Sequence, residues 1–285
     1  MDPDPAAAKD GNQIVVQLFK TTVITVAFIS CYKHNREDNP SLANIHFTLP
    51  DSVATEKKTV LLKKKKRTIY LTFDDGPNKG TRKVMQIARQ EQMPITMFLI
   101  GEQVYGSKEQ TATYDSILQC NYVQIANHSY THAHHQYEKF YAVPDSAVKD
   151  FIRCADSLKL TYNIVRTPGR NIWRTDAISS TDLKSSRAAA DSLQKNGMTV
   201  IGWDLEWHYD KDLKLKNTGD EMINQVDSMF VKEQTKTPNE LVILAHDQVY
   251  ADASDSAELH SFMQKLKNKD EYNFDVISNY PSIKN

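Results

Sequence analysis

Cysteine is scarce in this sequence. The 285 residues include only three, Cys31, Cys120 and Cys154, and no two of them are spaced as CxxC. A disulfide-stapled scaffold and a zinc site built from thiolates are therefore not indicated. A Cys120–Cys154 bridge stays possible, because sequence alone does not reveal the distance between two side chains.

An excess of charge of either sign is also absent. Lysine and arginine number 35, aspartate and glutamate 36, and the formal net charge is −1. This balance gives no electrostatic reason to expect a nucleic-acid partner. The one basic cluster, KKKKR at 63–67, is interpreted as a solvated lead-in to a strand. The chain also lacks a GxxxxGK(S/T) motif, so the phosphate-binding loop of many nucleotide hydrolases is not expected.

An apolar run near the N-terminus is too short to cross a bilayer, but it resembles an export signal. It lies between Lys20 and Cys31 and ends in Ser-Cys, a pattern similar to bacterial lipoprotein processing sites, although Phe28 stands where leucine is usual. Residues 1–31 are interpreted as a leader with a possible lipid anchor at Cys31, and 32–67 as a polar tether. The expectation is an exported bacterial protein of the cell envelope. The alternative is that the run forms a short buried strand or helix.

From Thr68 onward, apolar runs of strand character alternate with segments of helical periodicity. The strand-like runs are 68–73, 95–101, 122–127, 162–167, 198–204, 240–247 and 273–278. The helical segments include 80–92, 144–160, 181–197 and 218–234, with Asp145 and Thr218 at or near N-caps and Gly197 as a C-terminal stop. Such alternation predicts a parallel sheet with helices packed outside, either doubly wound or closed into a barrel.

Polar residues stand where the predicted strands end. The series is Asp74, Asp75, His128, Arg166, Asp204 and His246. The carboxyl ends of parallel strands meet at one edge of a sheet or one mouth of a barrel, which is where ligands bind in such folds. One polar residue at a strand end means little, but five strand ends of this kind indicate a convergent site.

The chemistry of these residues favours a metal ion. Adjacent carboxylates at Asp74 and Asp75 repel each other and are costly to bury unless a positive charge compensates. His128 and His132 are four residues apart, so a helix or a compact loop can place both imidazoles on one side. Two imidazoles and one carboxylate leave open positions on zinc, as a catalytic site requires.

Four short motifs, in this order along the chain, carry a family resemblance. They are TFDDGP at 72–77, HSYTH at 128–132, RTPG at 166–169 and LAH at 244–246. Together they resemble the polysaccharide deacetylases of carbohydrate esterase family four. The resemblance covers residues 68–285, which we interpret as the catalytic domain, and implies a distorted (β/α) barrel with parallel strands inside and helices outside.

The resemblance also implies roles for individual residues. Asp75, His128 and His132 would bind a divalent metal, usually zinc. Asp74 would act as general base on the water bound by the metal and His246 as general acid, while Arg166 would hold Asp74 and Asp204 would orient His246. Such a site cleaves an acetyl group from a sugar without a covalent enzyme intermediate.

Two departures from the family pattern leave details open. The family's fourth motif lies slightly further on, so Glu206 or Asp210 is an alternative to Asp204 as partner of His246. Gly169 stands where the family often has an aromatic residue, and Trp173 is a candidate to wall the pocket in its place. Trp203 or Trp207 is expected to line the sugar site.

The expected function is therefore metal-dependent removal of acetyl groups, foremost N-acetyl groups of amino sugars, from an acetylated glycan. The altered motifs keep open a second reading, a glycan-binding envelope lipoprotein with weak or no turnover. Hydrolysis of a small cyclic amide by the same site is a third. The sequence leaves open which glycan is used, N- against O-deacetylation, the identity of the metal and the oligomeric state.

Overall fold

Ten strands form one sheet at the centre of the domain in this computed structural model, which describes residues 66–283. The strands are β1 (Arg67–Gly76), β2 (Ile95–Leu99), β3 (Val123–Asn127), β4 (Ile164–Val165), β5 (Ile172–Arg174), β6 (Ser179–Thr181), β7 (Thr199–Val200), β8 (Leu205–Glu206), β9 (Glu240–His246) and β10 (Tyr272–Phe274). All seven predicted strand regions are present, although β4 and β7 keep only two residues each.

The sheet is mostly parallel. Its strands lie in the order β6-β5-β7-β4-β3-β2-β1-β9-β8, with β10 pairing β1 beside β2. Every pair that β1, β2, β3, β4, β8 and β9 make is parallel, as the alternation predicts. The hairpin β5–β6 was not predicted, and it joins β7 in the antiparallel sense. The prediction of a distorted (β/α) barrel is confirmed.

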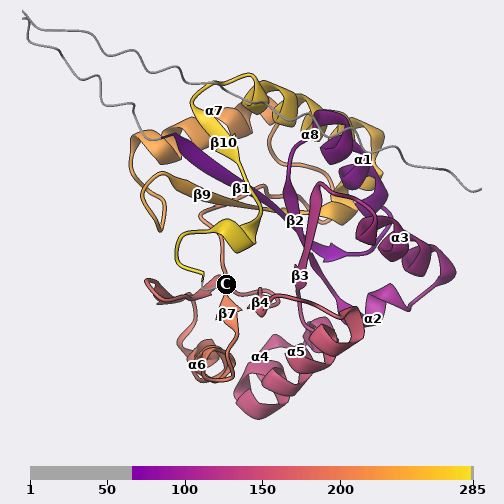
Figure 1. The fold of residues 1–285 in the computed structure, drawn as a ribbon, viewed down its shortest axis with the longest axis vertical. Helices are drawn as coiled ribbons and strands as arrows, with labels where there is room; N and C mark the ends of the chain where they lie inside the picture. Colours follow the sequence, from indigo (N-terminus) through magenta and orange to yellow (C-terminus); the bar gives the residue numbers. More distant parts are fainter. Residues whose placement is uncertain (1–65, 284–285) are drawn as a thin grey trace, which may run out of the picture. The chain divides into compact units, whose positions relative to one another are not determined.

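Helices cover the outside of this sheet (Figure 1). They are α1 (Thr81–Glu91), α2 (Gly101–Val104), α3 (Lys108–Leu118), α4 (Tyr137–Ala142), α5 (Pro144–Leu158), α6 (Arg187–Lys195), α7 (Gly219–Val231) and α8 (Ala253–Lys267), with short 3₁₀ turns η1 (His132–His135), η2 (Lys184–Ser186), η3 (Asp247–Ala251) and η4 (Ile277–Asn279). In Figure 1, α1, α7 and α8 lie near β1 and β9, whereas α4, α5 and α6 lie near β4 and β7.

The central strand β1 is buried on both faces. It pairs with β9 on one side and with β2 and β10 on the other. Six consecutive residues from Ile69 to Asp74 are almost inaccessible to solvent. A strand enclosed in this way reads as a continuous apolar run rather than an alternating one, and it fixes where the two aspartates at its end emerge.

The helix signals are confirmed in part. Thr218 forms a full capping box with Glu221 at the start of α7. Gly197 follows the end of α6 with a φ of +78°, the left-handed conformation that favours glycine. Asp145 does not cap: it lies in the first turn of α5 behind Pro144, and Val143 is the N-cap residue.

The packing corrects the expectations for two tryptophans and answers one question that the sequence left open. Trp173 is fully buried among core side chains, so it does not wall a pocket, and Trp207 is also in the core. Cys120 and Cys154 are free thiols rather than a bridge.

The leader 1–31 with Cys31 and nearly all of the tether 32–67 lie outside the described residues. Of the helices in the described part, none has the length and apolar character of a bilayer span.

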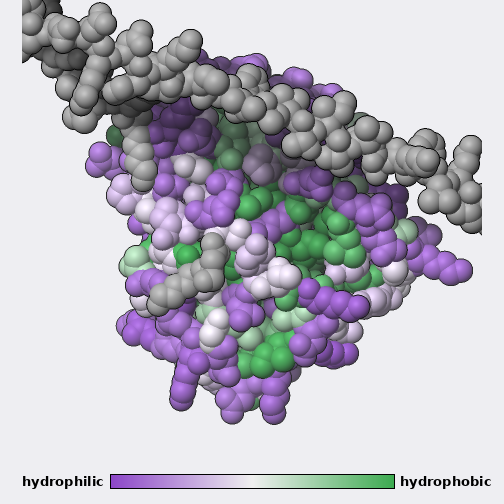
Figure 2. Space-filling model, in the orientation of Figure 1, coloured by the Kyte–Doolittle hydropathy of each residue, from purple (hydrophilic) through white to green (hydrophobic). Residues whose placement is uncertain are grey.

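Polar residues form the rim of the face of the domain that Figure 2 draws. On the face drawn in Figure 2, hydrophobic residues gather near the middle and polar residues surround them. The large hydrophobic side chains that remain exposed are Tyr105, Leu118, Val143, Ile152, Tyr162, Leu183, Leu213 and Val231. They belong to several separate elements, and single exposed hydrophobic residues are normal in folded proteins.

The capping difference between Thr218 and Asp145 gives a stability test. Thr218→Ala removes a side chain that accepts a hydrogen bond from the Glu221 backbone N–H, and we expect it to lower the free energy of unfolding by about 1 kcal/mol. Asp145→Ala removes an exposed first-turn residue with no cap bond, so a loss below about 0.5 kcal/mol is expected. Urea unfolding of both variants measures the two losses, and equal losses would contradict the assignment.

Candidate active site

A bulge at the end of β1 places two adjacent aspartates at one site. Successive side chains of a regular strand point to opposite faces. The pairing of β1 with β2 shifts between Asp74 and Gly76, so Asp75 is an extra residue, and its φ is +74°. This local change of direction is typical of a β-bulge. Both Asp74 and Asp75 consequently line the same cleft.

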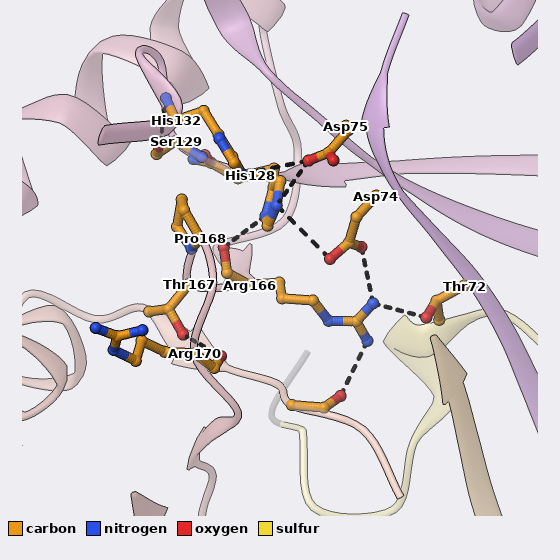
Figure 3. Close-up of polar contacts among 12 residues, drawn as sticks. Thr72, Asp74, Asp75, His128, Ser129, His132, Arg166, Thr167, Pro168 and Arg170 are labelled. Carbon is orange, nitrogen blue, oxygen red and sulfur yellow. Dashed lines mark hydrogen bonds and ion pairs between the residues drawn. The ribbon is translucent and has the colours of Figure 1, made fainter. Parts of the chain in front are cut away.

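Three predicted metal ligands converge at this bulge. Asp75 Oδ1 lies 3.4 Å from His128 Nε2 and 3.3 Å from His132 Nε2. The three ligand atoms lie within 4.8 Å of one another. Figure 3 shows the two imidazoles and the Asp75 carboxylate arranged around a common space. Ligands of tetrahedral zinc lie about 3.4 Å apart, given metal–ligand distances near 2.1 Å, so this spacing fits such an ion.

The protonation states also fit a cation. His128 Nδ1 lies 2.9 Å from the Arg166 carbonyl oxygen, so Nδ1 carries the proton and Nε2 presents its lone pair. Asp75 Oδ1 is buried and has no hydrogen-bond partner. Burial alone would lower the pKa of His128, but Asp74 and Asp75 outweigh it and raise that pKa, so the two carboxylates favour a positive charge at Nε2, either a proton or a metal ion that replaces it. Burial and the nearby His128 lower the pKa of His132 to about 4, which keeps that imidazole neutral at pH 7.

The segment that carries the two histidines is a tight loop rather than a helix. Ser129 and all residues of η1 have positive φ, so the chain turns left-handed after His128. Ser129 Oγ accepts a hydrogen bond from the His132 backbone N–H at 3.0 Å. Asp150 in α5 accepts hydrogen bonds from the backbone N–H groups of Tyr130 and Thr131. These bonds hold a strained loop, and the four-residue spacing works here without helical geometry.

The second aspartate is held by a buried arginine. Arg166 is 0% exposed, and its Nη1 donates hydrogen bonds to Asp74 Oδ1 at 2.9 Å and to Thr72 Oγ1 at 2.7 Å. Its Nε and Nη2 donate to the carbonyl oxygens of Ile201 and Gly202. Asp74 Oδ2 remains toward the ligands, 3.6 Å from His128 Nε2 (Figure 3). The predicted Arg166–Asp74 pair is therefore present, with one carboxylate oxygen left for chemistry.

His246 reaches the same cleft from the neighbouring strand. Its backbone pairs in register with Asp74, the last pair between β1 and β9. The imidazole lies against the Tyr209 ring, with centroids 5.1 Å apart, and its Nδ1 is buried without a hydrogen-bond partner. The cleft has a volume of about 650 Å³ and is also lined by Trp203 and Glu206. Six of the seven predicted site residues thus meet in one region.

Asp204 is the predicted residue that the structure does not bring to the cleft. Its Oδ1 accepts a hydrogen bond from the Lys236 backbone N–H at 2.7 Å, and its Oδ2 accepts one from the Val242 N–H at 2.9 Å. The carboxylate therefore ties a loop to β9 and does not support the expected role of orienting His246. Asp210 caps its own turn through the N–H groups of Asp212 and Lys214. Of the three alternatives, Glu206 alone lines the cleft.

An aromatic wall comes from a residue that the sequence analysis missed. Gly169 has a φ of +61°, and a Cβ added there would lie 3.1–3.2 Å from the Tyr137 ring. Tyr137 begins α4, lines the cleft and packs edge-on against the His132 ring at 5.8 Å. Tyr137 thus covers the backbone of Gly169, which has no side chain of its own. Its position just after the histidine motif was the only available signal.

The buried position of Asp204 gives a pH test that is independent of metal. Burial raises the pKa of Asp204 from its ordinary 3.8 to about 6, despite two backbone hydrogen bonds. The folded state therefore favours the protonated form, and this stabilisation is lost as pH rises from about 4 through 6. Relative to Asp204→Asn, the wild type should lose free energy of unfolding over that range and then level off. Urea unfolding of both metal-free proteins at each pH checks this, and a constant difference would contradict it.

Comparisons with known proteins agree with the family resemblance carried by the four motifs. The family model described as polysaccharide deacetylase matches residues 62–173. A putative polysaccharide deacetylase, YheN of Bacillus subtilis, is 25% identical over 217 residues, covering 74% of this chain and 67% of YheN.

Among solved structures, a family 4 carbohydrate esterase from Streptomyces lividans in complex with acetate aligns with a TM-score of 0.54 and 21% identity, over 76% of this chain and 95% of that one. The peptidoglycan deacetylase PdaC from Bacillus subtilis aligns with a TM-score of 0.51 and 20% identity, over 75% and 89%. At these identities the structures show a shared fold. The family model, the four motifs and the shared fold agree, which confirms the resemblance to the polysaccharide deacetylase family seen in the sequence.

Proposed function

We propose that the domain is a metal-dependent hydrolase that removes N-acetyl groups from amino sugars of a polysaccharide or oligosaccharide. One observation carries this proposal: a three-ligand cluster, a separately anchored carboxylate and a free imidazole meet in a single cleft. Asp75, His128 and His132 would hold the metal, for which zinc suits the ligand set. When bound, such an ion lowers the pKa of water and polarises a carbonyl group.

Asp74 is the general base in this proposal. An amide is a poor electrophile, so the attacking water has to lose its proton as it adds to the carbonyl carbon. Asp74 Oδ2 faces the ligand cluster, while Oδ1 is fixed by Arg166. The guanidinium balances the charge of Asp74 and prevents the carboxylate from turning away. Gly169 lines the cleft, and its backbone N–H is the donor that we assign to the oxyanion.

His246 is the general acid, and Glu206 is its supporting carboxylate. The departing amine needs a proton, which an imidazolium can donate near neutral pH. Glu206 pairs in register with Leu244, two residues before His246 on β9. Alternate residues of a strand share a face, so Glu206, Leu244 and His246 all meet at the cleft that they line. In this proposal Glu206, whose Oε1 lies 3.4 Å from His208 Nδ1, takes the role first expected of Asp204.

The names of the relatives supply the substrate class. YheN is named for polysaccharide and PdaC for peptidoglycan, and an envelope glycan of that kind would require export. The proposal therefore includes export to the cell envelope, with lipidation at Cys31 as the anchor. The export and anchor parts rest on the N-terminal sequence. Chitin-like oligomers, peptidoglycan and poly-N-acetylglucosamine are the first substrates to compare.

Metal removal and two aspartate variants test the proposed function. Acetate release from those glycans should stop after chelation and return with zinc or cobalt. Asp75→Ala should lose metal and activity together, because it removes a ligand. Asp74→Asn should keep the metal but lose at least about 100-fold in kcat, because it removes the base. Acetate assays and bound-metal analysis on the same samples measure both effects.

Outcomes of that experiment separate the readings. Full activity of metal-free Asp75→Ala would exclude the metal-dependent mechanism. Tight glycan binding without acetate release from any polymer would favour the glycan-binding reading instead. Asparagine is nearly the same size as aspartate. A loss of kcat in Asp74→Asn would therefore report lost proton transfer rather than lost packing.

Glu206 and Asp204 form a matched pair for the supporting carboxylate. We expect Glu206→Gln to lower kcat about tenfold or more. The loss should be greatest in the pH range in which His246 has to hold its proton. Asp204→Asn should leave kcat within about twofold, because its carboxylate bonds backbone groups away from the cleft. A pH–rate profile of each variant measures the effects. The reverse pattern would restore Asp204 to the role first predicted.

A further inference from the structure

A carboxylate that the proposed chemistry does not use lies beside the metal-ligand turn. Asp247 follows His246 in the chain and is 1% exposed. Its Oδ1 accepts a hydrogen bond from the Asn78 side-chain amide, and its Oδ2 accepts one from the Thr81 hydroxyl. Burial, with smaller contributions from Asp75 and Asp74, raises the pKa of Asp247 to about 7. Burying a carboxylate that has only neutral hydrogen-bond donors as partners costs folding free energy.

The turn after the two aspartates closes directly around Asp247. A Cβ on Gly76 would lie 2.6 Å from Asp247 Oδ2, and a Cβ on Gly80 would lie 1.7 Å from the Asp247 carbonyl oxygen. Any side chain at either glycine would displace Asp247 or the turn. The two glycines therefore let the backbone of the turn approach Asp247 closely.

One side-chain amide connects Asp247 to the backbone of a metal ligand. Asn78 Nδ2 bonds Asp247 Oδ1 and also donates to the Asp75 carbonyl oxygen at 3.2 Å. The Asn78 backbone N–H donates to Thr81 Oγ1 at 2.7 Å, and Thr81 in turn bonds Asp247. Asp75 is the bulged residue with a left-handed backbone. Such a conformation persists only where neighbouring groups hold it.

We propose that Asp247 is a positioning residue that clamps the 76–81 turn to the end of β9 and thereby fixes Asp75. Through Asn78 it holds the backbone of the metal ligand, and through the chain it is joined to His246. The metal-binding strand and the acid-bearing strand are thus locked at their ends, just past their last pair, Asp74 with His246. This role rests on the metal site of the proposed function, and it concerns how the ligand is held rather than the chemistry.

Asn78→Ala is the sharpest test, because it cuts the connection to Asp75 and leaves the Asp247–Thr81 bond intact. Outer groups that orient metal ligands are worth about 10–100-fold in metal affinity. We therefore expect the Kd for Zn²⁺ of the metal-stripped full-length protein to rise at least about tenfold. Competition with a chromophoric chelator measures Kd, and urea unfolding of the metal-free protein measures stability separately. A purely structural role would change the second quantity without the first.

Substitutions at Thr81 and Asp247 provide a rescue test. Thr81→Val keeps the shape and removes the hydroxyl, so zinc affinity should fall about tenfold. Thr81→Ser keeps the hydroxyl and should restore affinity to within about twofold of the wild type. Asp247→Asn should weaken binding like Asn78→Ala. If Asp247→Asn fails to fold, the Thr81 pair and Asn78→Ala still decide the question.

Gln110→Ala is the matched control. Gln110 in α3 donates to the Pro77 carbonyl oxygen at 2.9 Å, so it holds the same turn but does not touch Asp247. Its zinc Kd should stay within about twofold of the wild type. An equal loss in Gln110→Ala and Asn78→Ala would overturn the special role of Asp247, as would unchanged affinity in Asn78→Ala. If the wild type binds no zinc, the proposed metal site itself fails, a result distinct from either.

Discussion

The arrangement of this site depends on one constraint: the neighbouring carboxylates of Asp74 and Asp75 line the same cleft but have different partners. A regular strand would send Asp74 and Asp75 to opposite sides, and two like charges side by side repel. The left-handed bulge at Asp75 brings both to the cleft. Their surroundings then differ: Arg166 holds Asp74, whereas Asp75 faces the imidazoles of His128 and His132.

The predicted site residues that the structure brings together are those whose positions are set by the strands. The carboxyl ends of β1, β3, β4 and β9 meet because parallel neighbours end at one edge, so Asp75, His128, Arg166 and His246 could be expected together. The hairpin β5–β6 was missed because its short strands are partly polar and lie beyond the last parallel pair. The bulge itself was not predictable from composition, since Asp75 gives no sign of a positive φ.

The failed expectations concern residues in loops and at the ends of short strands. Asp204 stands directly after an apolar run and was therefore placed with the other strand-end residues. Strand β7 ends four residues earlier, at Val200, and the intervening backbone turns Asp204 toward β9. Glu206 on β8 regains the cleft because β8 pairs with β9 in parallel. Asp204 and Glu206 are only two residues apart, yet of these two carboxylates only Glu206 lines the cleft.

The residues that form the wall of the cleft are positioned differently from the strand-end residues at its floor. The floor groups project from paired strands, whose register leaves little freedom, and for that reason short motifs identified them. The wall is supplied wherever a side chain happens to fill space, as Tyr137 does over Gly169. Packing of this kind depends on distance rather than on position in the chain, so one residue can replace another from a separate element. It follows that the reaction class can be inferred from motifs, whereas the choice of glycan has to be sought in the loops around α4 and β8.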